Sequence, residues 1–432
     1  MGKKLFVFLW PLFIISEAMG VNTVKVDGIN YEFNSATKTA KCTGVYDNFF
    51  PENIKSIWIK DKITVNNESY TVTSIGDYAF NGFTYVTTLY LPETVEEIGT
   101  CAFFGCQYLP EVTLPKNLIN IGDGAFQKCK NIKTIEIPSG VTTIGRYAFL
   151  ECHALETVKI NAKLKAIEFR CFDECKSLTS INIPSTVESL GQSSFKNCSS
   201  LKKLTIPADV YEIGDRAFEG CESLDDIVLP EKIKYIGEGT FHYCRSLSQI
   251  VIPSSVESIG KEAFMFCEAL ETVEMKYELK TLNIGGVIAT SDRGVQTIDE
   301  DAFNNCINLT TVKLPKTVTK IGDFAFYDCW KLNVIHCENP DPPRAYYGTF
   351  SGVNRPACSL YVPEASIDAY KNTSPWDLFF IQPSPDDNNA VESIYSEDEY
   401  SRIHSLNGIK IRNKSALSKG IYIINGKKRV VR

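Results

Sequence analysis

One pattern of apolar and polar positions recurs along most of the chain, with a period of 23 residues. The phrase is IGxxAFxxCxxLxxVxIPxxVxx, and its positions are numbered here from the first Ile. Internal repeats of this length indicate a solenoid, in which each repeat is one structural unit that stacks on its neighbours. The first residues of the eleven copies are Ile75, Ile98, Ile121, Ile144, Ile167, Leu190, Ile213, Ile236, Ile259, Ile298 and Ile321.

The apolar positions within one repeat predict a buried wedge followed by a short strand. Position six is Phe in every copy, and position five is nearly always Ala. Positions twelve, fifteen and seventeen are Leu, Val or Ile in nearly all copies, as at Leu109, Val112 and Leu114. Polar residues lie between them, so this half alternates as a half-buried strand does. Pro at position eighteen then ends the strand, because proline has no N–H to donate to a ladder.

A single repeat is too small to be stable alone. Roughly eight apolar side chains at about 1.5–3 kcal/mol each compete with about 1–2 kcal/mol of backbone entropy for every ordered residue. Stacking covers the exposed faces of each unit and adds hydrogen bonds between strands. We therefore predict an α/β leucine-rich-repeat solenoid of 23-residue units with short parallel strands, in the form of a curved or superhelical rod.

Position nine is Cys in ten of the eleven copies, and the first copy has Phe83 there instead. Many cysteines in an exported chain usually indicate disulfides, and stacked coils bring neighbouring α-carbons close enough for bridges. The spacing, however, is the repeat period, and replacement by Phe indicates an apolar filler, a role that free Cys fulfils. We therefore expect buried free thiols at Cys106, Cys129, Cys152, Cys175, Cys198, Cys221, Cys244, Cys267, Cys306 and Cys329.

The first twenty residues have the pattern of a secretory signal peptide. Lys3 and Lys4 precede a stretch, 5–15, that is almost wholly apolar, and Ala18 and Gly20 supply small residues for cleavage near Gly20–Val21. A buried N-terminal strand is the alternative. No later stretch has 18 or more apolar residues, so we expect no membrane span in the mature chain. The predicted location is secreted or on the outer cell surface.

The repeats resemble the BspA-like family of bacterial leucine-rich repeats. The stretches IGDGAFQKCKNIKTIEIPSGVTT and IGDRAFEGCESLDDIVLPEKIKY carry the resemblance most strongly. Residues before the repeats, ending in YTVTSIGDYAF, resemble the family's leading segment, and CSLYVP with Trp376 resembles its closing segment. The resemblance implies a surface protein that adheres to host or neighbouring-cell components, although fold alone does not fix function.

The C-terminal residues predict a small β structure. Two apolar runs flank Asn425-Gly426, a pair that suits the type I′ turn of a hairpin. The segment resembles the C-terminal sorting signal of type IX secretion in Bacteroidetes; a plain hairpin cap is the alternative. The predicted organisation is a signal peptide (1–20), an N-terminal capping segment (21–74), the repeats (75–342), a C-terminal capping segment (343–382), a linker (383–393) and a small β segment (394–432).

Charge and motifs exclude several function classes. The formal net charge is −7 without a dense Lys/Arg cluster, which argues against nucleic acid and anionic membranes as partners. The chain lacks the signatures of serine hydrolases, phosphate loops, zinc peptidases and dinucleotide sites. Cys152 and His153 are adjacent in sequence, and Cys244 lies two residues after His242, but both cysteines belong to the column that we expect to be buried. We predict no enzymatic activity, no cofactor and no metal site.

Candidate binding residues lie on the outward row between positions fifteen and seventeen and in the one break of the period. From that row we select Tyr90, Thr113 and Glu136, and a second group, Val228, Val251 and Glu274, because two valines are apolar where solvent favours polarity. Between Ile259 and Ile298 the step is 39 residues, sixteen more than the repeat. This excess is either a functional loop or an extra degenerate coil, and its candidates are Asn283, Asp292 and Arg293.

Three functions agree with these observations. The first is protein binding or adhesion, with an extracellular or surface protein as the ligand, host matrix proteins included. The second is glycan capture at the surface, which requires exposed aromatic side chains, and the outward row within the repeats offers Tyr90 alone. The third is a structural part of the envelope without a dedicated ligand. The sequence leaves the ligand and the oligomeric state open.

Overall fold

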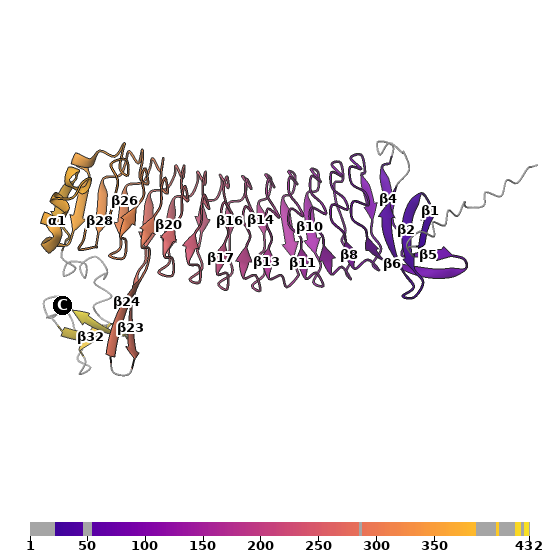
Figure 1. The fold of residues 1–432 in the computed structure, drawn as a ribbon, viewed down its shortest axis with the longest axis horizontal. Helices are drawn as coiled ribbons and strands as arrows, with labels where there is room; N and C mark the ends of the chain where they lie inside the picture. Colours follow the sequence, from indigo (N-terminus) through magenta and orange to yellow (C-terminus); the bar gives the residue numbers. More distant parts are fainter. Residues whose placement is uncertain are drawn as a thin grey trace, which may run out of the picture.

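The computed structural model describes residues 22–45, 54–284, 287–385, 403–405, 420–424 and 427–431. They include a parallel β-solenoid of about 13 turns that forms an elongated rod (Figure 1). The predicted leucine-rich-repeat fold is thus confirmed. Helix is scarce: among the described residues the one α-helix is α1 (Ile367–Lys371), in the C-terminal segment. The predicted signal peptide lies outside the described residues.

Each coil contributes a strand to a first ladder, which ends at position one of every repeat. Its strands within the repeats have only two residues, of which the second is buried, and strands of neighbouring coils pair in parallel, as Ile98 pairs with Ile121. In the described coils the strand pairing is interrupted after Ile144 and after Ile213, so the ladder consists of three sheets. The strands are β8 (Glu97–Ile98), β9 (Asn120–Ile121), β11 (Thr143–Ile144), β13 (Ala166–Ile167), β15 (Ser189–Leu190), β17 (Glu212–Ile213), β19 (Tyr235–Ile236), β21 (Ser258–Ile259), β25 (Thr297–Ile298) and β27 (Lys320–Ile321).

The second ladder is the strand that the alternating half of the repeat predicts. Its buried residues are positions fifteen and seventeen, as in β10, where Ile135 and Ile137 are buried and Glu136 is exposed. Its strands are β4 (Ser56–Trp58), β7 (Thr88–Tyr90), β10 (Thr134–Ile137), β12 (Thr157–Ile160), β14 (Ser180–Ile181), β16 (Lys203–Leu204), β18 (Asp226–Ile227), β20 (Gln249–Ile252), β22 (Thr272–Met275), β26 (Thr311–Leu314), β28 (Val334–Cys337), β29 (Ser359–Val362) and β30 (Phe380–Pro383).

The third side of the coil is a tight turn around the Ala-Phe pair. The Phe195 N–H donates to the carbonyl of Ala217 in the next coil at 2.9 Å, and Phe303 does the same to Ala325 at 2.8 Å. Positions four and eight on either side of the pair adopt positive φ, for example 58° at Arg216. Backbone in this left-handed region reverses the chain within a few residues. The turn therefore stacks by hydrogen bonds without being a strand.

The phenylalanines of position six form one continuous stack inside the rod. Ring centroids of successive coils are 5.1–5.9 Å apart and their planes lie within 16° of parallel. Phe350 of the closing segment extends the stack beyond Phe326. Phe83 packs edge-on at one end, and Trp376 packs edge-on against Phe350 at the other. Aromatic edges thus close both ends of the stack.

The cysteines of position nine are buried and free, as expected. Each Sγ donates to the carbonyl of the phenylalanine in the preceding coil, at 3.2 Å from Cys198 to Phe172 and 3.6 Å from Cys106 to Phe80. The apolar-filler interpretation was therefore incomplete, since the thiol is also a hydrogen-bond donor between coils. Burial raises the pKa of the Cys106 and Cys152 thiols to about 12.

Position two is glycine in nine of the eleven copies, with Glu168 and Asp299 in the other two. A Cβ built on Gly214 would lie 2.4 Å from the Gln192 backbone nitrogen of the preceding coil. On Gly145 it would lie 2.5 Å from the nitrogen of Asp123. These contacts are far below van der Waals distance, so the close approach of successive coils selects glycine here.

Both ends of the rod depart from the repeat. At the N-terminal end β1 (Asn22–Val26), β2 (Ile29–Asn34) and β3 (Thr39–Gly44) form an antiparallel meander, and β3 then pairs in parallel with β6 (Glu68–Ile75), on which β5 (Lys62–Val65) folds back. At the other end α1 lies among the short 3-10 helices η2 (Arg355–Ala357), η3 (Glu364–Ser366) and η4 (Trp376–Leu378). Non-repeating ends cover the last coils of a solenoid.

The sixteen extra residues form neither a loop nor another coil. They make an antiparallel hairpin of β23 (Glu278–Ile284) and β24 (Val287–Arg293), which projects from the rod (Figure 1). In the tail, β32 (Gly420–Ile424) and β33 (Lys427–Val431) pair antiparallel, which confirms the predicted hairpin, and β31 (Ile403–Ser405) joins β32. Most of the predicted linker (383–393) lies outside the described residues.

Candidate binding surfaces

The outward row of the second ladder is the first candidate surface, and it is chemically mixed. Val228 is 75% exposed and Val251 is 41% exposed, and Val251 pairs in register with Glu274. Val251 and Glu274 are thus direct neighbours, and Val228 belongs to the preceding coil. Lys313 and His336 follow Glu274 in successive coils.

The other three candidates of this row lie nearer the N-terminal end of the rod. Tyr90 is 47% exposed, and Thr113 and Glu136 are also exposed. The carboxylate of Glu136 accepts from Lys159 at 2.8 Å, and this hydrogen bond lowers its pKa. The predicted row therefore consists of two groups with three coils between them.

A groove of about 690 Å³ runs between the base of the hairpin and the second ladder. Glu274 and Arg293 both line it, together with Lys313, Tyr277 and Ser254. Asp292 lies at the same base, where its carboxylate pairs with Lys316 at 3.0 Å. One candidate from the outward row, Glu274, and one from the insertion, Arg293, thus line the same groove. Asn283 is in β23, in register with Ile288.

The sequence interpretation missed aromatic residues that extend the outward row beyond the repeats. Trp58 of β4 is 61% exposed and stacks on Tyr90 with centroids 5.4 Å apart. At the other end Tyr361 stacks on His336 at 4.9 Å. The argument against glycan capture counted Tyr90 alone and is therefore corrected. Trp58 and Tyr361 lie outside the eleven copies, so the repeat pattern does not show that they pair in register with Tyr90 and His336.

A second surface runs along the first ladder, between its outward residues at position twenty-three and the side chains at position three. The glycines of position two form its floor in two stretches, with Glu168 at the equivalent position between them, so we call it the glycine groove. One stretch, of about 560 Å³, includes Gly99, Gly122 and Gly145. Another, of about 410 Å³, includes Gly191, Gly214 and Gly237. The sequence pattern gave no hint of it, because the first ladder is too short to alternate.

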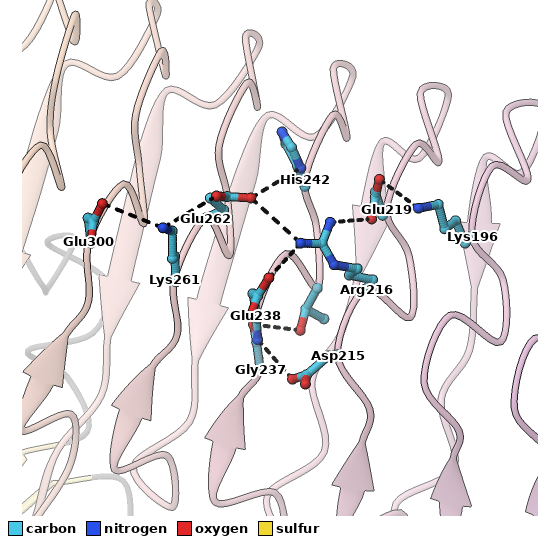
Figure 2. A network of polar contacts seen from close by, with 11 residues as sticks. Lys196, Asp215, Arg216, Glu219, Gly237, Glu238, His242, Lys261, Glu262 and Glu300 are labelled. Carbon is cyan, nitrogen blue, oxygen red and sulfur yellow. Dashed lines mark hydrogen bonds and ion pairs between the residues drawn. The ribbon is translucent and has the colours of Figure 1, made fainter.

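A network of ion pairs joins the coils beside the second stretch (Figure 2). Arg216 is its centre and lies 3.0 Å from Glu219, 2.5 Å from Glu238 and 3.9 Å from Glu262. These four residues belong to three successive coils. Glu219 also pairs with Lys196 at 3.0 Å. Pairs of this kind add little individually when exposed, but here they fix the wall of turns next to the groove.

His242 lies within this network without a hydrogen-bond partner on either ring nitrogen. Its Nδ1 is 4.0 Å from Glu262, and its ring stacks on Tyr243 with centroids 4.2 Å apart. Burial lowers the pKa of His242, although Glu219 and Glu262 oppose that shift. The neutral imidazole is therefore favoured, and it serves as a packed ring in the turn.

The residues weighed for chemistry are enclosed by the core. Cys152 and Cys244 are fully buried, and burial raises the pKa of both thiols, which disfavours the nucleophilic thiolate. Across the described ranges no three His, Cys, Asp or Glu side chains gather to hold a metal ion. Nor does the described part contain a helix with the length and apolarity to cross a membrane.

Comparison with known proteins agrees with this architecture. The fold and repeat define a leucine-rich-repeat solenoid. The family model described as "BspA type Leucine rich repeat region" matches in six copies over residues 73–202, 165–285 and 288–357. These matches cover more than half of the sequence, so the chain belongs to that family.

Solved structures of similar proteins come from several bacteria. A leucine-rich cell surface protein of Faecalibacterium prausnitzii is 26% identical, with a TM-score of 0.52, over 80% of this chain and 97% of that one. A leucine-rich repeat protein of Bacteroides ovatus is also 26% identical, with a TM-score of 0.41, over 73% and 94% of the two chains. A search of the curated proteins gave no match. The family and the first neighbour indicate a surface or protein-binding role.

Proposed function

We propose that the chain is exported and acts at the outer cell surface as a protein-binding scaffold without a catalytic step, capturing an extracellular protein, host matrix proteins included. The observation that carries the proposal is the convergence of the outward row and the hairpin on one groove. Glu274 and Arg293 line that groove from two elements, and Val251 is Glu274's neighbour in the ladder.

The chemistry of this surface suits a protein ligand. Exposed valines supply apolar contact beside charged groups of both signs, a mixture typical of protein interfaces. The hairpin adds a projecting edge, because β23 and β24 pair only with each other among the described strands. Unpaired strand edges bind extended segments of other proteins through main-chain hydrogen bonds.

Deletion of residues 279–294 tests the proposal. It removes sixteen residues and restores the 23-residue step between Ile259 and Ile298, so the coil should still stack. Binding of the chain to immobilised fibronectin, laminin and collagen, and to the envelope of its own organism, is then measured by biolayer interferometry. We expect a binder in this panel, and the deletion should abolish its binding while the melting temperature stays unchanged.

A matched pair of point variants separates the row from the hairpin. Val228→Ser with Val251→Ser should weaken the same interaction, whereas Lys159→Ser, an exposed position of the same row, should not. Unchanged capture by a folded deletion variant would contradict this assignment, and so would a panel without any binder.

Export is the second part of the proposal. The signal peptide pattern predicts a mature chain that begins near Val21, and N-terminal sequencing of the secreted or surface fraction tests it. Removal of residues 394–432 should then retain the protein inside the outer membrane if the tail is a sorting signal. Surface display of the truncated chain would instead favour the plain hairpin cap.

A further inference from the structure

The glycine groove changes character along the rod. In the stretch lined by Gly99, Gly122 and Gly145, no aromatic side chain reaches the groove among its described lining residues. In the stretch lined by Gly191, Gly214 and Gly237, Tyr211 and Tyr235 both line it. Of these two stretches, only the second is lined by aromatic side chains.

The two tyrosines are exposed, and neither occupies one of the buried positions of the repeat. Tyr211 is 53% exposed and Tyr235 is 59% exposed, at positions twenty-two and twenty-three of successive coils. The residue in register with Tyr235 in the next coil is Ser258. Exposed rings beside a concavity indicate a contact surface, because they offer large apolar faces at small entropic cost.

Polar groups complete the stretch. Gln192 and Asp215 stand at position three on one side, and Glu212 stands between the tyrosines in sequence; all three are exposed. The Glu238 N–H donates to Asp215 at 2.9 Å, which fixes that carboxylate against the wall of the ion-pair network (Figure 2). Carboxylate and amide oxygens accept hydrogen bonds from hydroxyl groups.

The floor admits an elongated occupant. Since a Cβ at Gly237 would lie 2.2 Å from Asp215 and one at Gly214 2.4 Å from Gln192, the floor stays bare backbone across three coils. The two carboxylates repel an anionic chain. A neutral sugar chain fits this stretch instead. Its apolar ring faces would stack on the tyrosine rings, and its hydroxyl groups would donate hydrogen bonds to the carboxylates above the bare backbone floor.

We propose that the glycine groove between Tyr211 and Tyr235 binds a neutral polysaccharide. This site lies on the first ladder, whereas the proposed protein-binding surface lies on the second ladder and the hairpin. The two proposals are independent, and the chain would hold a glycan and a protein on different sides.

Affinity gel electrophoresis of the whole mature chain tests the site, with soluble galactomannan, mixed-linkage β-glucan, arabinoxylan and mannan in the gel and with polygalacturonate as the anionic probe. At least one neutral polymer should retard the chain, and polygalacturonate should not. The variant Tyr211→Ala with Tyr235→Ala should weaken binding about tenfold or more, which corresponds to about 1.4 kcal/mol.

Two controls distinguish binding at this stretch from non-specific binding of the polysaccharide to the protein surface. Trp330→Ala removes a side chain that is 61% exposed elsewhere, and Asn120→Ala with Thr143→Ala alters the stretch of the groove without aromatic side chains. Both should bind as the parent does, and all variants should melt at the parent temperature. Absence of retardation by every neutral polymer would overturn the proposal, as would equal retardation of the folded double tyrosine variant or preference for polygalacturonate.

Discussion

The interior of the rod and its hairpin differ in how their contacts recur along the chain. Inside, nearly every coil repeats the same contacts: a phenylalanine stacks on the next, and a thiol donates to the carbonyl of the preceding coil. The hairpin interrupts the period once and has no counterpart in the other described coils. Periodic residues therefore maintain the rod, and residues that break the period distinguish this protein from any other stack of the same coils.

The largest expected effect is on the stack. Phe195→Ala removes a fully buried ring between Phe172 and Phe218 and should lower the free energy of unfolding by about 3–5 kcal/mol. Trp330→Ala, at an exposed position, should change it by less than about 0.5 kcal/mol. Urea denaturation followed by circular dichroism measures both. Equal stability of the two variants would mean that the stack does not hold the coils together.

A smaller loss is expected at the floor of the glycine groove. Gly214→Ala places a Cβ against the Gln192 backbone and should destabilise by about 1–3 kcal/mol, although Gly→Ala at an unhindered site stabilises. Urea denaturation shows whether this substitution lowers or raises the free energy of unfolding. A gain in stability would show that successive coils can separate without cost.

The thiol column should show a loss of about 1–2 kcal/mol for Cys198→Ala, because the carbonyl of Phe172 loses a donor and a small void forms. Cys101, which is only partly buried, serves as the control and should tolerate Ala. Titration with a thiol reagent should find that the column reacts only after unfolding. Rapid reaction of the native column would contradict burial.

The smallest effect is on pH dependence. Burial lowers the pKa of His153, His242 and His336 in the folded chain. The unfolded chain therefore binds protons at higher pH, so stability is full above the ordinary histidine value of about 6.5 and declines as the pH falls through the folded values. The denaturation midpoint should be lower at pH 5.5 than at pH 7.5. His242→Phe, which keeps the ring stacked on Tyr243, should reduce that difference, and an unchanged difference would exclude His242 as a contributor.

The sequence predicted what the period repeats eleven times. Phe, Cys and the alternating strand recur at the same positions in nearly all copies, so each of these predictions rests on many independent observations. The structure confirms all three. The first ladder escaped prediction because a two-residue strand has no alternation. The donor role of the thiols escaped as well, since spacing does not report which carbonyl lies nearby.

Residues outside the period were harder to place. Gly285-Gly286 between two β-rich runs is a turn signal of hairpins, and it would have identified the insertion. Trp58 could not be assigned to a surface, because its neighbour Tyr90 comes from another coil. The binding candidates of the row and insertion stay predictions, although two of them, Glu274 and Arg293, line one groove.

Amide hydrogen exchange of the free chain tests the contrast between interior and hairpin most directly. The account predicts slow exchange at the buried strands and turns of the central coils, for example at Phe195, whose N–H donates to Ala217. It predicts fast exchange along β23 and β24, which lack a third strand among the described residues. Exchange in the central coils as fast as in the hairpin would contradict a continuous packed interior.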